Sequence, residues 1–252
     1  MQNGIFFSII SLFYCVFMCI RFFMRKRIET KENKIYSFLL LTTLIGLFIE
    51  VVPATLMIRN IIHVQDSILI FILKLILIYM SIWLLMFTYY IIVISINNSK
   101  KVQTFKNIGV FLILLNIIMI FILPLNYYIN NGAAYSYGPA ADYLYLISGM
   151  LVFICVVLLV TNIRKLSLRK YCPLIIFIIF GITVIAIQYR YPELTLMLSL
   201  HTFIVCIMYN TIENPDVKMI DELNKNRKLI EKANEDKSNF LFRMAQEVRQ
   251  PV

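Results

Sequence analysis

Residues 68–96 read ILIFILKLILIYMSIWLLMFTYYIIVISI, a nearly unbroken apolar run. A helix needs about 20 predominantly apolar residues to cross a bilayer. Six further runs meet or approach that length: residues 4–24, 35–58, 108 to about 129 (with Pro124 late in it), 143–161, 173–187 and 194–212. The pattern predicts an all-α fold in which residues 1–212 form a seven-transmembrane helix bundle.

The composition argues against a large soluble core. Apolar residues make up 60% of the chain and charged residues 15%, whereas soluble domains are about 45–50% apolar. The net charge of +10 is compatible with binding to nucleic acid. The basic residues lie instead in short loops beside apolar runs, as expected for membrane proteins. Membrane lipids are therefore the expected partners, and nucleic acid is not.

The loop charges also predict an orientation. Basic residues follow the first, third and fifth runs, and the intervening loops hold only Arg59 and Arg190. Cytoplasmic loops are the ones enriched in Lys and Arg. We expect a multi-pass protein of the cell membrane, with the N-terminus outside and the C-terminus in the cytoplasm. The basic residues are Arg21, Arg25, Lys26, Arg27, Lys31, Lys34, Lys100, Lys101, Lys106, Arg164, Lys165, Arg169 and Lys170.

The five cysteines give no sign of a zinc site. None belongs to a CxxC pair, and the chain has only two His. Structural zinc sites are usually built from closely spaced Cys and His ligands. Because every Cys lies in or beside an apolar run, we interpret them as apolar fillers, and no metal or other cofactor is expected in this chain.

The end of the chain, residues 213–252, has a different pattern. Pro215 suits the first position of a helix, and no Gly or further Pro occurs before Gln250. Apolar residues recur at intervals of three and four, but polar residues interrupt the heptad seam. This predicts a weak cytoplasmic coiled-coil signalling helix that forms a homodimer through residues 216–250. A solvated amphipathic helix is the alternative. The apolar positions are Ile220, Leu223, Ile230, Leu241, Met244 and Val248, and the interruptions are Arg227, Asn234 and Lys237.

Residues 237–252 read KSNFLFRMAQEVRQPV and resemble the phospho-acceptor helix of sensor histidine kinases. The family pattern is a Phe-Leu pair, a Met, a Ser-His-Glu triplet, an aliphatic residue, an Arg, one further residue and a Pro. A Tyr-Gly-Pro arrangement at residues 137–139 also resembles the seven-span input region of some bacterial histidine kinases. The matching positions in the tail are Phe240, Leu241, Met244, Glu247, Val248, Arg249 and Pro251.

Two positions depart from that family pattern. Ala245 stands at the Ser position and Gln246 at the position of the phosphorylated His. Phosphoryl transfer to the helix needs a nucleophilic nitrogen, which a carboxamide does not supply. Glu247, which the resemblance casts as a helper of that His, has nothing to assist. We therefore expect no kinase activity from these residues, whether the chain is a fragment or a stand-alone degenerate member.

The resemblance also implies partners. In the family, ATP and Mg²⁺ bind to a separate catalytic domain, for which residues 1–252 provide no sequence. A response regulator or a partner kinase is a candidate downstream partner.

Three ionisable residues lie within the predicted spans. Glu50, Lys74 and His201 each lie about 12–14 Å below the outer boundary, at a rise of about 1.5 Å per residue. Glu50 and Lys74 are candidates for an ion pair that sets helix register. The alternative is a polar pocket open to the outside, with His201 as a third wall. Tyr135 and Tyr137 in the longest outer loop are candidates for a ligand lip, or for ordinary aromatic anchors.

These features favour a membrane receptor that relays a signal to a dimeric cytoplasmic helix. The alternative is a small-molecule or ion transporter or channel, with Glu50, Lys74 and His201 lining the path. The absence of an internal repeat and the long tail both disfavour that alternative. An intramembrane enzyme is disfavoured because no two His share a helix turn and no two Asp lie in the spans.

Overall fold

A computed structural model describes residues 3–24, 30–58, 66–96, 99–130, 133–162, 168–191, 194, 196–212 and 215–248. These residues form helices and one two-stranded sheet. The elements are α1 (Asn3–Met24), α2 (Lys31–Ile58), α3 (Asp66–Ser95), α4 (Ser99–Ile122), β1 (Asn126–Asn130), β2 (Ala133–Tyr137), α5 (Pro139–Asn162), α6 (Leu168–Arg190), α7 (Met197–Ile212) and α8 (Pro215–Val248). The chain divides into two compact units, Met1–Ile212 and Glu213–Val252.

Helices α1 to α6 have the length and composition of membrane spans. Among the described residues, six helices are long and apolar enough to cross a bilayer. Helix α7 is apolar but shorter, with 16 residues. A chain with this many long apolar helices is a multi-pass membrane protein by composition and length.

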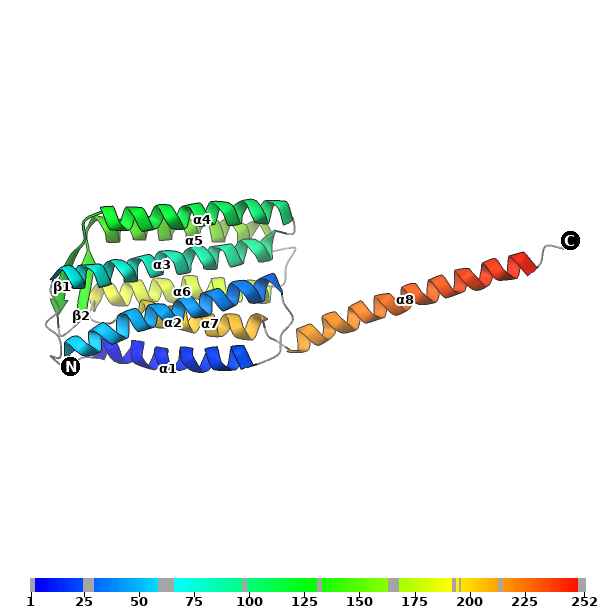
Figure 1. Ribbon diagram of the computed structural model, residues 1–252, viewed down its shortest axis with the longest axis horizontal. Helices are drawn as coiled ribbons and strands as arrows, with labels where there is room; N and C mark the ends of the chain where they lie inside the picture. Colours follow the sequence, from blue (N-terminus) through cyan, green and yellow to red (C-terminus); the bar gives the residue numbers. More distant parts are fainter. Residues whose placement is uncertain are drawn as a thin grey trace. The chain divides into compact units, whose positions relative to one another are not determined.

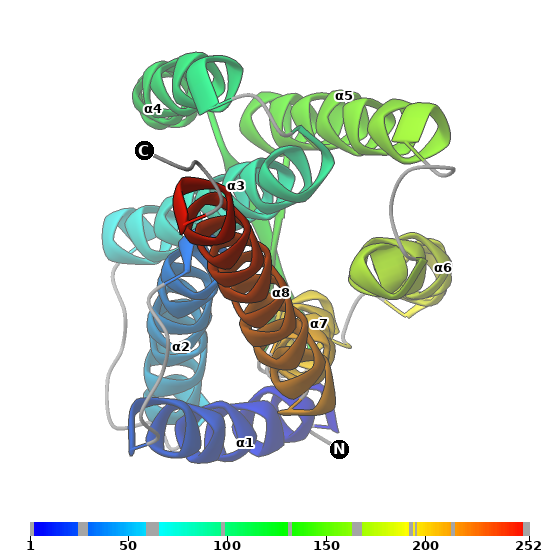
Figure 2. The ribbon, with the colours of Figure 1, turned by 90° about the vertical axis from the view of Figure 1, so that its right-hand side faces the viewer.

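Helices α3 and α7 organise the packing of the first unit. Helix α3 lies against α2, α4 and α5, whereas α7 lies against α1, α2 and α6 (Figure 2). Half of the residues in the most apolar stretch of α3 are buried, compared with 11% in the corresponding stretch of α4. Helix α3 is therefore central, and α4 turns most of its apolar surface outward, as expected of a helix that faces lipid.

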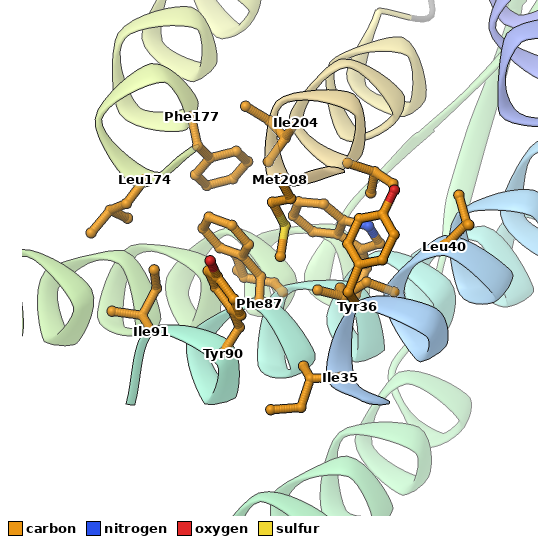
Figure 3. Packing of buried hydrophobic residues seen from close by; sticks show 14 of the residues in the cluster. Ile35, Tyr36, Leu40, Phe87, Tyr90, Ile91, Leu174, Phe177, Ile204 and Met208 are labelled. Carbon is orange, nitrogen blue, oxygen red and sulfur yellow. The ribbon is translucent and has the colours of Figure 1, made fainter. Parts of the chain in front are cut away.

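The main buried cluster is rich in aromatic side chains. Trp83 and Phe87 of α3 are fully buried, and both rings lie against Phe177 of α6. Phe87 belongs to the same cluster as Met208 of α7 and Tyr36 of α2 (Figure 3). Lipid tails are as apolar as these side chains, so in a bilayer the cluster stabilises the bundle through close packing rather than through exclusion of water.

The chain leaves helix α4 after Ile122, which corrects the prediction that the fourth span extends to about Ile129. Pro124 has no amide hydrogen, and a proline disfavours helical backbone at the residue before it. Strands β1 and β2 then form an antiparallel hairpin at one end of the bundle (Figure 1). We call this the hairpin end. Gly138, with a φ of 103°, adopts the left-handed conformation that leads from β2 into α5.

The second unit contains the single long helix α8. Its apolar residues Leu223, Ile230, Leu241 and Met244 are all exposed within the structure. The guanidinium of Arg227 and the carboxylate of Glu231 form an ion pair of 2.9 Å, one turn apart. Both side chains are largely exposed, so this ion pair stabilises the helix by only about 0.3–0.5 kcal/mol.

Candidate functional site

A set of buried polar side chains joins α2, α3 and α7 in the interior of the bundle. The hydroxyl of Tyr79 and Nδ1 of His201 share a hydrogen bond of 2.9 Å. The indole Nε1 of Trp83 donates to Oγ1 of Thr43 at 2.9 Å, and that hydroxyl donates to the carbonyl of Leu39 at 2.7 Å. We call Thr43, Tyr79, Trp83 and His201 the buried polar network. None of the four is more than 5% exposed.

Aromatic stacking fixes the His201 ring in place. The imidazole lies parallel to the indole of Trp83, with ring centroids 3.9 Å apart and planes 9° apart. Phe87 stacks against Trp83 at 5.3 Å, and Phe177 lies 5.8 Å from it. Buried polar groups are costly unless hydrogen-bonded. The network meets that requirement through two hydrogen bonds between helices, Tyr79 to His201 and Trp83 to Thr43.

Helix α2 approaches the network through Gly46. A Cβ at this position would lie 2.4–2.6 Å from three ring atoms of Tyr79, closer than side chains tolerate. Glu50 is one helical turn further along, on the same face as Gly46. Its Oε2 atom is buried. Tyr79 therefore faces the side of α2 that carries Glu50 and is bonded to His201, two of the predicted site residues.

Lys74 has different partners from the one that its position in the sequence predicts. Its ammonium donates to the backbone carbonyls of Phe121 and Leu123, at 2.7 and 3.0 Å. Phe121 is in the last turn of α4, and Leu123 follows the end of that helix. Carbonyls at a helix end lack the backbone amide donor that the next helical turn would supply. Lys74 therefore fastens the end of α4 to α3, and the expected ion pair with Glu50 is replaced by this contact.

The hairpin tyrosines lie apart from the buried polar network. Tyr137 on β2 is exposed, and the side chain of Tyr135 is outside the described residues. A neighbouring tyrosine, Tyr127 on β1, donates to the carboxylate of Asp66 at 2.6 Å. This hydrogen bond raises the pKa of Tyr127 above its ordinary value of 10.0, because ionisation would remove the donated proton. The bond holds the hairpin against the start of α3.

The structure describes only part of the segment that resembles a phospho-acceptor helix. The backbone of Gln246 and Glu247 lies in α8, but their side chains are outside the described residues. Arg249 and Pro251 are outside the described part of the chain altogether.

The buried polar network consists of hydrogen bonds and ring stacking among three helices. In the described part of the chain, no three His, Cys, Asp or Glu side chains gather as a typical metal site. The polar contacts of the network join three helices and share partners. A change at one contact therefore disturbs the others. Sequence reasoning singled out Glu50 and His201 as candidates, but not Tyr79, Trp83 or Thr43. Aromatic and hydroxyl residues are common in membrane helices and do not stand out by charge.

Comparison with protein-family models finds no match to this chain, and comparison with curated proteins finds none either.

Proposed function

We infer that this chain is the membrane-embedded sensing region of a two-component sensor histidine kinase. In this proposal the bundle detects a signal in the membrane or outside it and relays that signal through a dimeric cytoplasmic helix. The observation that carries the proposal is the buried polar network. Polar groups inside membrane spans are expensive and usually functional, and this network includes a residue of α7.

The chain itself connects the network to the tail. Helix α7 ends at Ile212 and α8 begins at Pro215. His201 lies on α7, so in this proposal a movement of that helix acts on α8, which begins three residues after α7 ends. Counting α7 as the seventh span gives an odd number of crossings, which agrees with an N-terminus outside and a C-terminus in the cytoplasm.

The tail supports a dimeric relay. Leu223, Ile230, Leu241 and Met244 form an exposed apolar stripe at heptad spacing, with Asn234 within the seam. Two copies of α8 would bury that stripe against each other. A polar residue in the seam keeps alternative registers close in energy, which a two-state switch requires.

Catalysis is not part of the proposal. Gln246 occupies the position of the phosphorylated His, and a carboxamide nitrogen is not a nucleophile. A response regulator or a partner kinase would therefore have to receive the signal through contact with α8 rather than through a phosphoryl group. Incubation of the purified chain with ATP and Mg²⁺ should give no self-labelling.

The proposal is tested by disturbing the network and observing the tail. The full chain carrying Asn234→Cys is reconstituted in vesicles, and disulfide cross-linking between copies is followed over time. We expect Tyr79→Phe or His201→Ala to change the cross-linking rate several-fold, because the perturbation at α7 alters the pairing of α8. Tyr145→Phe is the matched control, since Tyr145 of α5 is 65% exposed and far in sequence from the network.

An unchanged rate in both network variants would contradict the relay. A chain that passes ions or small solutes across the vesicle membrane, and keeps that flux when residues 215–252 are deleted, would favour the transporter or channel instead.

A further inference from the structure

A second group of polar side chains lies where α1, α2 and α7 meet, at the end of the bundle opposite the hairpin. Cys15 and Cys19 are one turn apart on the same face of α1. Cys15 is 1% exposed, and its sulfur lies 3.9 Å from the carbonyl oxygen of Leu40. From α7, the sulfur of Cys206 lies 2.8 Å from the hydroxyl of Tyr14. All three cysteines are free thiols.

Two buried phenols at this site have polar atoms that nothing in the described chain satisfies. The hydroxyls of Tyr36 and Tyr209 are buried and have no hydrogen-bond partner among the described residues. Their rings lie 6.3 Å apart, and both residues belong to the buried cluster that contains Cys15, with Cys19 packed against it. A buried O–H donor without an acceptor is costly. Two such donors beside a group of thiols would both be satisfied by an anionic acceptor at this site.

A positive charge lies at the same place. The guanidinium carbon of Arg21 is 5.5 Å from the ring centroid of Tyr209. A charge in a membrane span is usually matched by an opposite charge or a polar group. The site therefore offers one cation and two O–H donors, which suits the formation of an anion among the thiols.

We propose that Cys15 and Cys19 bind one soft monovalent metal ion of the Cu(I) class, with Tyr36, Tyr209 and Arg21 stabilising the anionic complex. The balanced step is Cu⁺ + 2 RSH → [Cu(SR)₂]⁻ + 2 H⁺, in which two copper–sulfur bonds replace two S–H bonds. Thiolates select soft ions of this kind. Loss of the thiol protons turns both sulfurs into acceptors for the unsatisfied hydroxyls.

The geometry favours a bridging ion over a disulfide. Side chains one turn apart on a helix have Cβ atoms about 5–6 Å apart, whereas a disulfide requires about 3.5–4.5 Å. Two sulfur ligands are sufficient for a soft monovalent ion. Met18, which is 4% exposed and lies between the two cysteines on α1, offers a thioether as a further soft donor. This inference does not depend on a sensory role, because metal binding is measured directly.

The test uses the purified full chain in detergent. Cu(I) is supplied under a reductant with a colorimetric Cu(I) chelator as competitor, and Ag(I) serves as a redox-inert probe. We expect one ion per chain to resist the competitor. Cys15→Ser and Cys19→Ser should each weaken binding by more than about 100-fold, because each removes a ligand, and Tyr36→Phe by about 10-fold, because it removes an outer hydrogen bond.

Matched controls are provided by the other thiols. Cys155→Ser replaces a buried thiol of α5, and Cys172→Ser replaces a half-buried thiol of α6. Both should leave the tight site unchanged. If Cys15→Ser fails to fold, as judged by gel filtration, the half-buried Cys19 decides the matter. Tight binding that survives Cys19→Ser, or that all four serine variants weaken equally, would overturn the proposal.

Discussion

The imidazole of His201 lies flat against the indole of Trp83, with a centroid separation of 3.9 Å and an interplanar angle of 9°. The contact joins α3 to α7, and each ring also makes a hydrogen bond to a further residue: His201 to Tyr79 and Trp83 to Thr43. The stack and the two hydrogen bonds therefore depend on one another. A substitution at any of these residues should be felt by the other three.

The first prediction concerns the Tyr79 hydroxyl. Tyr79→Phe keeps the ring but leaves Nδ1 of His201 without its hydrogen bond in a buried position. We expect the free energy of unfolding to fall by about 1–3 kcal/mol, measured by denaturant unfolding in detergent. Tyr145→Phe, at an exposed position of α5, should change it by less than about 0.5 kcal/mol. Equal effects at both positions would show that the hydrogen bond adds nothing.

Gly46→Ala tests the close approach of α2 to Tyr79. The added methyl group would lie 2.4–2.6 Å from the Tyr79 ring, so the ring, which is hydrogen-bonded to His201, must shift or the helices must separate. Overpacking of this kind costs about 1–3 kcal/mol. Gly149→Ala in α5 is the control, because no atom lies within 4 Å of its Cβ.

The control should be neutral or slightly stabilising, by up to about 1 kcal/mol, since alanine favours helix over glycine. Thermal unfolding of the two variants in the same detergent compares them directly. If Gly46→Ala behaves like Gly149→Ala, Gly46 is not in contact with Tyr79.

Lys74→Met removes the ammonium that binds the carbonyls of Phe121 and Leu123. We expect a loss of about 1–3 kcal/mol, because two acceptors lose a charged donor. Combined with Glu50→Gln, the two changes should be additive to within about 0.5 kcal/mol, as expected for residues that are not partners. A double-mutant cycle measured by denaturant unfolding decides this. A coupling energy of several kcal/mol would restore the ion pair that the sequence predicts.

The Tyr127–Asp66 contact should make the hairpin sensitive to alkaline pH. The folded protein holds the Tyr127 proton more tightly than the unfolded chain, since the pKa of Tyr127 is raised by its hydrogen bond to Asp66. The stabilising effect is therefore complete below pH 10.0 and is lost as the pH rises through the folded-state pKa. The pKa of Tyr127 is measured by NMR of Cζ-labelled tyrosine, with Tyr127→Phe to assign the signal.

Asp66→Asn should bring that pKa down towards the ordinary value, because it removes the charged carboxylate that accepts the hydrogen bond from Tyr127. A resonance that titrates identically in the parent chain and in Asp66→Asn is the contrary result.

Dimerisation through α8 predicts a pattern of cross-linking. Asn234→Cys lies in the apolar seam, whereas Lys232→Cys lies on the opposite face of the helix. Oxidation should link two copies of the first variant at least about tenfold faster than the second. The unsubstituted chain shows how much of the signal comes from the native thiols. Equal rates for the two variants would indicate that α8 is a solvated single helix.

Some features follow from the sequence because they are local. Long apolar runs predict membrane helices wherever they occur, since a lipid environment requires every backbone group to be satisfied within the segment. Pro215 and the helix-forming residues after it likewise predict α8. The hairpin had a local signal too: Asn131-Gly132 between residues rich in tyrosine is typical of a two-residue turn. The run of apolar residues around Pro124 predicts instead that the helix continues to about Ile129.

The partners of the polar residues were decided only by the tertiary structure. The sequence marks Glu50, Lys74 and His201 as costly in a membrane, because burial of a charge or dipole is a property of the residue type. It does not tell which backbone or side-chain atoms satisfy them. That depends on how helices rotate and slide against each other, so Lys74 binds carbonyls of α4, and Tyr79 and Trp83, unremarkable by charge, surround His201.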